Sequence, residues 1–154
     1  ASLCAVVFRD CISSKFIMAI DIFCRPTGFL KIIELAIAFV CIALVNSYAL
    51  SFGIGQHRFI VGVTTIGGMI LVTLPLLIAH LFSDMIHKTV LEVLDNFIGF
   101  IMFAATGGLV IEFYHERDFD EEKYNAGLAL GSLCIINAIV YFLDFIIAVR
   151  NRKA

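Results

Sequence analysis

The stretch from Arg25 to Leu50 constrains the fold more than any other part of the chain. From Gly28 onward it is apolar for long enough to cross a bilayer, which takes about 20 residues of helix. A basic collar, Arg25 and Lys31, stands at its start, and Glu34 lies roughly two turns inside. A charged side chain at this depth is costly, so we expect something polar to meet the carboxylate.

Three further apolar stretches predict the same kind of element. Of the 154 residues, 61% are hydrophobic, whereas a soluble domain is about 45–50% apolar. We predict an all-α membrane protein, an antiparallel bundle of four transmembrane helices formed by residues 26–154. The spans are expected at 28–50, 59–82, 89–111 and 126–149, with a strongly acidic loop at 112–125.

Residues 1–25 are expected to form a separate cytoplasmic segment. Apolar residues recur there at helical spacing, but charged residues break every run before it is long enough to span. This pattern favours a helix lying in the membrane interface, and a signal peptide is the alternative. Three cysteines near the membrane surface are candidate lipidation sites: Cys4, Cys11 and Cys24.

The distribution of Lys and Arg predicts the orientation, because positive residues near span ends prefer the cytoplasm. Arg58, Arg117 and Lys123 would lie on one side. The rest of the 11 would lie on the other: Arg9, Lys15, Arg25, Lys31, Lys88, Arg150, Arg152 and Lys153. Both termini are therefore predicted to be cytoplasmic, in a plasma or vesicle membrane.

Ionisable residues inside the spans are expected to share one level on the cytoplasmic side. They form a predicted buried polar layer of Lys31, Glu34, His80, Asp95 and Asp144. Glu92 is shallow enough that we expect it to reach water. The layer is interpreted as a packing device that holds the helices in register. The alternatives are an ion or proton site, since acids in membranes often mark pathways, and simple snorkelling to the interface.

Small residues predict where helices approach closely, because they let two backbones come together. The candidate packing positions are Gly67, Gly68, Gly107, Gly108, Gly127 and Gly131. Gly127 and Gly131 form a GxxxG pattern. Packing inside the bundle is the favoured use, and the interface of a homo-oligomer is the alternative.

No pattern in the chain indicates catalysis or a cofactor. We find no nucleophile–base pair, zinc cluster or phosphate-binding glycine loop, and the acidic loop lacks the spacing of a calcium-binding loop. The net charge of −2 gives no reason to expect nucleic acid as a partner. We therefore predict a protein that is not an enzyme and that holds no metal or cofactor.

The chain resembles the MARVEL domain, a four-span module found in the myelin and lymphocyte protein and in plasmolipin. The likeness rests on the Gly28–Glu34 opening GFLKIIE, on Asp95 within LEVLDNFIGF, and on the ending YFLD (141–144) followed by basic residues. Claudins, tetraspanins, and the synaptophysin and occludin branches fit less well, because the cysteines expected in their loops are missing.

The resemblance implies a role in membrane apposition, vesicle trafficking, sorting into ordered lipid, or cell junctions. The implied partners are membrane lipids, including cholesterol-rich ones, and other membrane proteins. A small ion or proton transporter, or an accessory subunit of a larger membrane complex, is the competing hypothesis, because it would use the buried acidic layer.

Overall fold

The computed structural model describes residues 26–53, 55–82 and 90–153. The described chain forms four long helices, α2 (Pro26–Tyr48), α3 (Gln56–Phe82), α4 (Val90–His115) and α5 (Glu121–Lys153). Each of the four is long and apolar enough to cross a membrane, and the described residues thus form four spans of an integral membrane protein. The predicted interfacial helix falls within residues 1–25, outside the described part of the chain.

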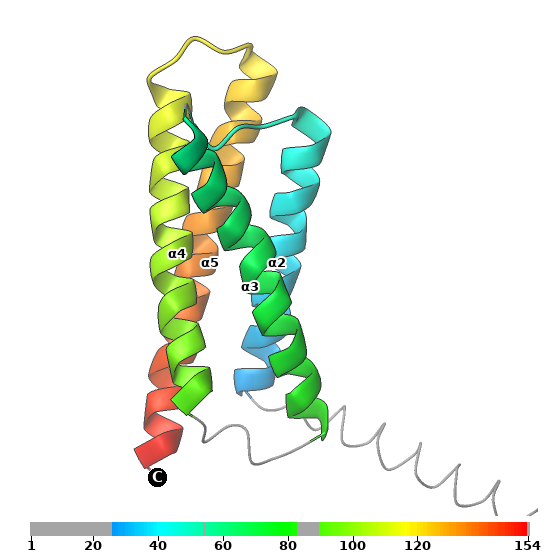
Figure 1. The fold of residues 1–154 in the computed structure, drawn as a ribbon, viewed down its shortest axis with the longest axis vertical. Coiled ribbons are helices and arrows are strands. Elements are labelled where there is room, and N and C mark those ends of the chain that lie inside the picture. Colours follow the sequence, from blue (N-terminus) through cyan, green and yellow to red (C-terminus); the bar gives the residue numbers. More distant parts are fainter. Residues whose placement is uncertain (1–25, 54, 83–89, 154) are drawn as a thin grey trace, which may run out of the picture.

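The four helices pack side by side as an antiparallel bundle, which confirms the predicted all-helical architecture (Figure 1). Helix α2 packs against α3 and α5, and α4 packs against the same two helices. The contact between α4 and α5 is the most extensive in the bundle. We name the two ends of the bundle after a residue near each. The Lys31 end is the end at which α2 and α4 begin, and the Tyr114 end is the end at which they finish.

The outer surface of the bundle is apolar. Leu71 is 74% exposed, Leu91 56% and Phe39 52%. In water such a surface would be unfavourable, but in a bilayer the surrounding lipid tails are as apolar as the side chains. The backbone needs no partner outside the bundle, since each helix satisfies its own N–H and C=O groups.

Helices α4 and α5 approach closely where glycines face each other. A Cβ atom on Gly131 would lie 3.2 Å from the carbonyl oxygen of Gly107, and one on Gly107 would lie 3.0 Å from that of Gly131. Gly127 leaves room for the ring of Tyr114 in the same way. Three of the predicted packing glycines thus lie in one helix–helix contact, where any side chain would push the backbones apart.

The other three predicted packing glycines make no comparably close contact in the described bundle. A Cβ atom on Gly67 or Gly108 would meet nothing within 4 Å, and one on Gly68 would only reach Thr64, 3.8 Å away. Gly67 and Gly68 are partly buried and Gly108 is exposed, and the interface of a homo-oligomer stays a prediction for all three. The sequence alone could not distinguish them, because a small residue is equally permissible on a lipid-facing surface.

The acidic connection at the Tyr114 end is shorter than the predicted loop at 112–125. Helix α4 continues to His115 and α5 already begins at Glu121. Glu121 and Glu122 lie in the first turn of α5, where negative charge is favourable against the helix dipole. The Asp120 carbonyl accepts a hydrogen bond from the Tyr124 N–H at 2.9 Å, which closes that turn.

Replacing Gly131 by leucine should destabilise the bundle by about 1–3 kcal/mol, because the new side chain has to force α4 and α5 apart. The measurement is unfolding of the purified protein in mixed detergent micelles, followed by circular dichroism. The matched control is Gly108→Leu, which places the same side chain on an exposed face of α4. Equal losses of stability in the two variants would contradict the packing described for Gly131.

Candidate functional site

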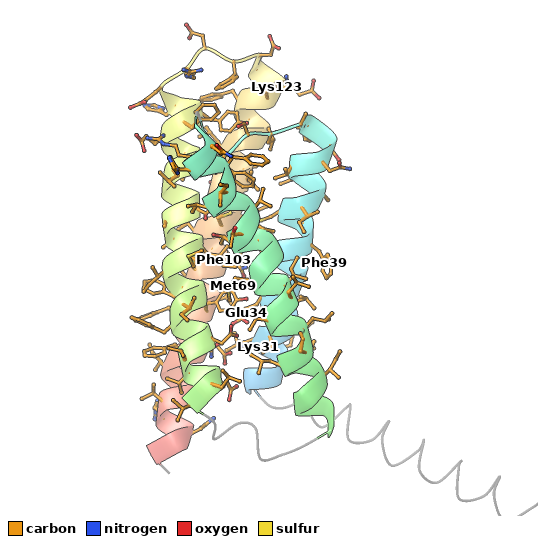
Figure 2. The ribbon with its side chains drawn as sticks, viewed as in Figure 1. Lys31, Glu34, Phe39, Met69, Phe103 and Lys123 are labelled. Carbon is orange, nitrogen blue, oxygen red and sulfur yellow. The ribbon has the colours of Figure 1, made fainter. Side chains whose placement is uncertain are left out.

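Lys31 is completely buried on α2, near the Lys31 end of the bundle (Figure 2). Its Nζ atom lies 3.0 Å from Oε2 of Glu34 and 3.2 Å from Oδ2 of Asp144. Oδ2 of Asp95 lies 3.6 Å from the same nitrogen. One ammonium group is therefore surrounded by three carboxyl groups, which come from α2, α4 and α5.

Asn96 completes this arrangement from α4. Lys31 donates a hydrogen bond to Oδ1 of Asn96, and Nδ2 of Asn96 donates to Oδ2 of Asp144 at 2.9 Å. The amide thereby bridges the lysine to the carboxylate and joins all three helices. We call the five residues Lys31, Glu34, Asp95, Asn96 and Asp144 the Lys31 cluster.

The Lys31 cluster contains more acid than base. Glu34 and Asp144 are 0% exposed, and Asp95 is 6% exposed. Three carboxyl oxygens of the cluster lie out of reach of any hydrogen-bond donor of the described residues: Glu34 Oε1, Asp95 Oδ2 and Asp144 Oδ1. Burying a charged group costs free energy unless the group is paired and hydrogen-bonded, so an excess of buried carboxyl groups over ammonium groups is unusual.

Neutral hydrogen bonds attach α3 to the rest of the bundle. The hydroxyl groups of Thr73 and Tyr141 lie 2.8 Å apart, next to the Lys31 cluster. Further toward the Tyr114 end, Thr106 donates to Thr65 at 2.9 Å. The Lys31 ammonium also lies 5.2 Å from the centre of the Tyr141 ring, so this tyrosine links the cluster to α3.

At the Tyr114 end the bundle is closed by aromatic side chains. The Tyr114 hydroxyl accepts a hydrogen bond from the Ser51 N–H at 3.0 Å, which ties the connection after α2 to α4. The rings of Tyr114 and Phe119 lie 4.8 Å apart. This end carries no buried charge among the described residues, so the bundle is electrostatically asymmetric.

Of the five residues in the predicted polar layer, the structure brings four together: Lys31, Glu34, Asp95 and Asp144. His80 lies in α3, but its side chain is outside the described ones, as are Cys4, Cys11 and Cys24. The expectation for Glu92 was wrong, because this residue is only 1% exposed. Its position near the helix start suggested access to water, but depth along the helix does not show which side of the helix a side chain lies on.

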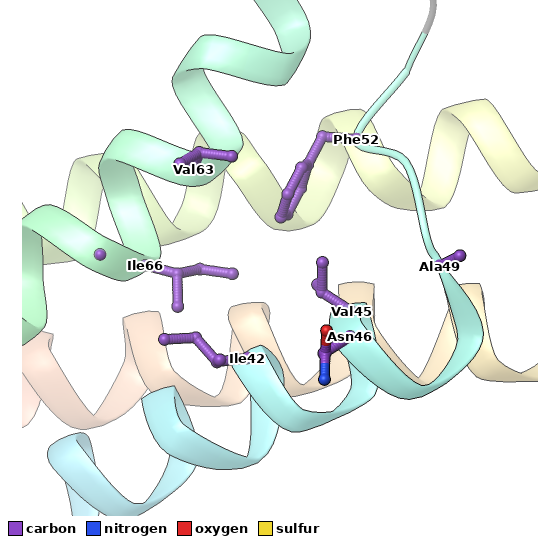
Figure 3. A pocket seen from close by; sticks show the side chains of 8 residues that line it. Ile42, Val45, Asn46, Ala49, Phe52, Val63 and Ile66 are labelled. Atoms are coloured by element: carbon purple, nitrogen blue, oxygen red, sulfur yellow. The ribbon is translucent and has the colours of Figure 1, made fainter.

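A groove of about 420 Å³ lies between α2 and α3, toward the Tyr114 end (Figure 3). Its walls are mostly apolar, with Ile42 and Val45 on α2 facing Val63 and Ile66 on α3. Asn46 is the polar exception. The groove contains none of the charged residues of the Lys31 cluster, so the two features are separate.

The described residues offer no group of three or more His, Cys, Asp or Glu side chains placed to hold a metal ion. In the Lys31 cluster the lysine ammonium already occupies the point on which the carboxyl groups converge. What this arrangement can do chemically is to hold charge and protons inside the bundle.

Replacing Lys31 by methionine should destabilise the bundle by about 3–5 kcal/mol at neutral pH, because the carboxyl groups lose their only close counter-charge among the described residues. The measurement is unfolding in detergent micelles. The matched control is Lys123→Met, the same substitution at an exposed lysine of α5, which should change stability little. If both variants unfold alike, the cluster contributes nothing specific to folding.

No family model matches the chain, and no solved structure matches it. The chain is 32% identical over 97 residues to protein snakeskin of Bombyx mori. The aligned part covers 58% of this chain and 62% of that protein. It is 33% identical over 78 residues to protein snakeskin of Drosophila melanogaster, covering 46% of this chain and 48% of that protein. The chain thus spans about half the length of the curated relatives it matches, and it is a distant homologue of the snakeskin proteins. The resemblance to the MARVEL family stays a prediction.

Proposed function

We propose that this protein is a non-enzymatic structural component of cell–cell junctions. It would reside in the plasma membrane with both termini in the cytoplasm, and it would organise the membrane through contacts with lipids and other membrane proteins. In this proposal the main activity is membrane apposition. Sorting of lipids and traffic of vesicles toward the junction would support that activity.

One observation carries the proposal: almost all of the described chain lies in the four membrane helices. The described connections at the Tyr114 end, at residues 49–53 and 116–120, are short. Catalysis usually needs a concave pocket with convergent polar groups, and the groove between α2 and α3 is mostly apolar. The helices themselves therefore provide the interaction surface.

The similarity to the snakeskin proteins supports the junction role, and it favours a junction of the septate kind. The resemblance to the MARVEL domain points the same way, because membrane apposition and cell junctions are among the roles that it implies. Both lines of support favour a structural protein over an enzyme.

Membrane lipids and other membrane proteins are the proposed partners. The groove between α2 and α3 opens on the apolar face of the bundle and is large enough to receive part of a lipid chain. Exposed apolar side chains on α3 and α4, such as Leu71 and Leu91, offer further surface for a partner's transmembrane helix. Contacts of this kind depend on close packing within the membrane.

The junction role predicts where the protein accumulates and what its loss does. In an epithelium that makes this protein, a tagged copy should concentrate at lateral cell–cell borders, and deletion should increase the passage of a fluorescent dextran between cells. Re-expression of the wild type or Gly108→Leu should restore the barrier, whereas Gly131→Leu should restore it poorly. An unchanged barrier after deletion, with the protein confined to internal vesicles, would refute the junction role.

The Lys31 cluster favours one competing function, a small ion or proton transporter. The structural role predicts that liposomes containing the purified protein show no more proton, sodium or potassium flux than empty liposomes, measured with entrapped fluorescent indicators. A flux that Glu34→Gln abolishes would overturn the structural role and favour transport. Because Glu34 lies inside the cluster, that variant tests the proposed pathway directly.

A further inference from the structure

We propose that the Lys31 cluster is a proton-binding site. At neutral pH the carboxyl groups of Glu34 and Asp95 each hold a proton, and Asp144 is the ionised partner of Lys31. This inference does not depend on the junction role, because a protein can store protons in its interior without moving them across the membrane.

The first argument is the charge balance. With every group ionised, Lys31 would face Glu34, Asp95 and Asp144, and these four residues would carry a net charge of −2. An unpaired charge in such a site costs several kcal/mol, whereas a protonated carboxyl group is neutral. Two protons make the four residues neutral.

The second argument identifies the ionised group. Because Oδ1 of Asn96 accepts a hydrogen bond from Lys31, the orientation of this amide is defined and its Nδ2 atom points at Asp144. Oδ2 of Asp144 therefore receives the amide N–H at 2.9 Å and lies 3.2 Å from the ammonium group. Donors aimed at one oxygen favour the charged form of a carboxyl group.

The third argument identifies the protonated groups. Asp95 is the most distant of the three from the ammonium group, at 3.6 Å, and its Oδ2 atom receives no hydrogen bond from the described residues. Glu34 accepts one hydrogen bond from Lys31 on Oε2, which leaves Oε1 without a partner there. A proton on the second oxygen of Glu34 would keep its contact with Lys31 and remove its net charge.

The remaining helices supply few groups that could change this balance. On α5, Tyr141 faces the cluster as a neutral phenol whose hydroxyl group lies next to Thr73 of α3. The side chain of His80 on α3 is outside the described ones, whereas His57 and Arg58 lie in the first turn of that helix, at the Tyr114 end. The experiment therefore includes a His80 variant.

Infrared spectroscopy of the full chain in lipid vesicles at neutral pH tests the proposal directly. A protonated carboxyl group has its own C=O stretching band, which shifts when the protein is transferred to D₂O. We expect such a band in the wild type, with one part lost in Glu34→Gln and another lost in Asp95→Asn. Glu112→Gln, at a carboxylate that is 46% exposed and pairs with Arg58, should leave the band unchanged.

Stability of the same variants provides a second readout. An amide closely mimics a neutral carboxyl group, so Glu34→Gln and Asp95→Asn should change the folding equilibrium constant by less than about tenfold. Asp144→Asn leaves Lys31 without its ionised partner and should lower that constant by about a hundredfold or more. If Asp144→Asn does not accumulate, the wild-type spectrum still decides the question.

Two results would overturn the proposal. The first is the absence of the band in the wild type, in particular if it appears only in His80→Gln, because His80 would then supply the counter-charge. The second is a loss of stability in Glu34→Gln and Asp95→Asn as large as in Asp144→Asn, because all three carboxyl groups would then be ionised.

Discussion

A lysine buried in a membrane bundle is the constraint on which the rest of this structure depends. Lys31 follows the start of α2 by little more than one turn, yet its side chain turns inward and is completely buried. An ammonium group in that position needs oxygen partners, and they come from the same helix, from α4 and from α5. The cluster therefore fixes the relative height of three helices at once, since a shift of one helix along its axis would break several contacts.

The polar cluster and the glycine contact have different roles in holding the bundle together. In lipid the hydrophobic effect does not drive helices together, so association depends on close packing and on polar contacts. Helices α4 and α5 use backbone contact at Gly107 and Gly131, whereas α3 depends on hydroxyl pairs such as Thr73 with Tyr141. The apolar side chains that remain face outward, toward the lipid.

Much of this could be predicted from the residue pattern, and the failures have physical causes. The number of helices and the convergence of Lys31, Glu34, Asp95 and Asp144 followed from apolar length and from equal depth in the bilayer. The expectation for Glu92 was wrong because depth measures distance to water along the membrane normal, and a side chain close to the surface by that measure is buried here. Gly67, Gly68 and Gly108 make no close contact of the kind seen at Gly107 and Gly131, and a glycine in a sequence does not reveal which face of its helix meets a neighbour.

The sequence by itself determined that this protein lies in a membrane, because four apolar segments of membrane-spanning length cannot be buried in one small globule in water. It also determined that charged groups inside those segments had to gather, since an isolated charge in hydrocarbon is too costly. Only the tertiary structure decided how they gather: that Asn96 bridges Lys31 and Asp144, and that acid exceeds base around one ammonium group. These features depend on the rotation of each helix about its axis, which is set by contacts between side chains far apart in the sequence.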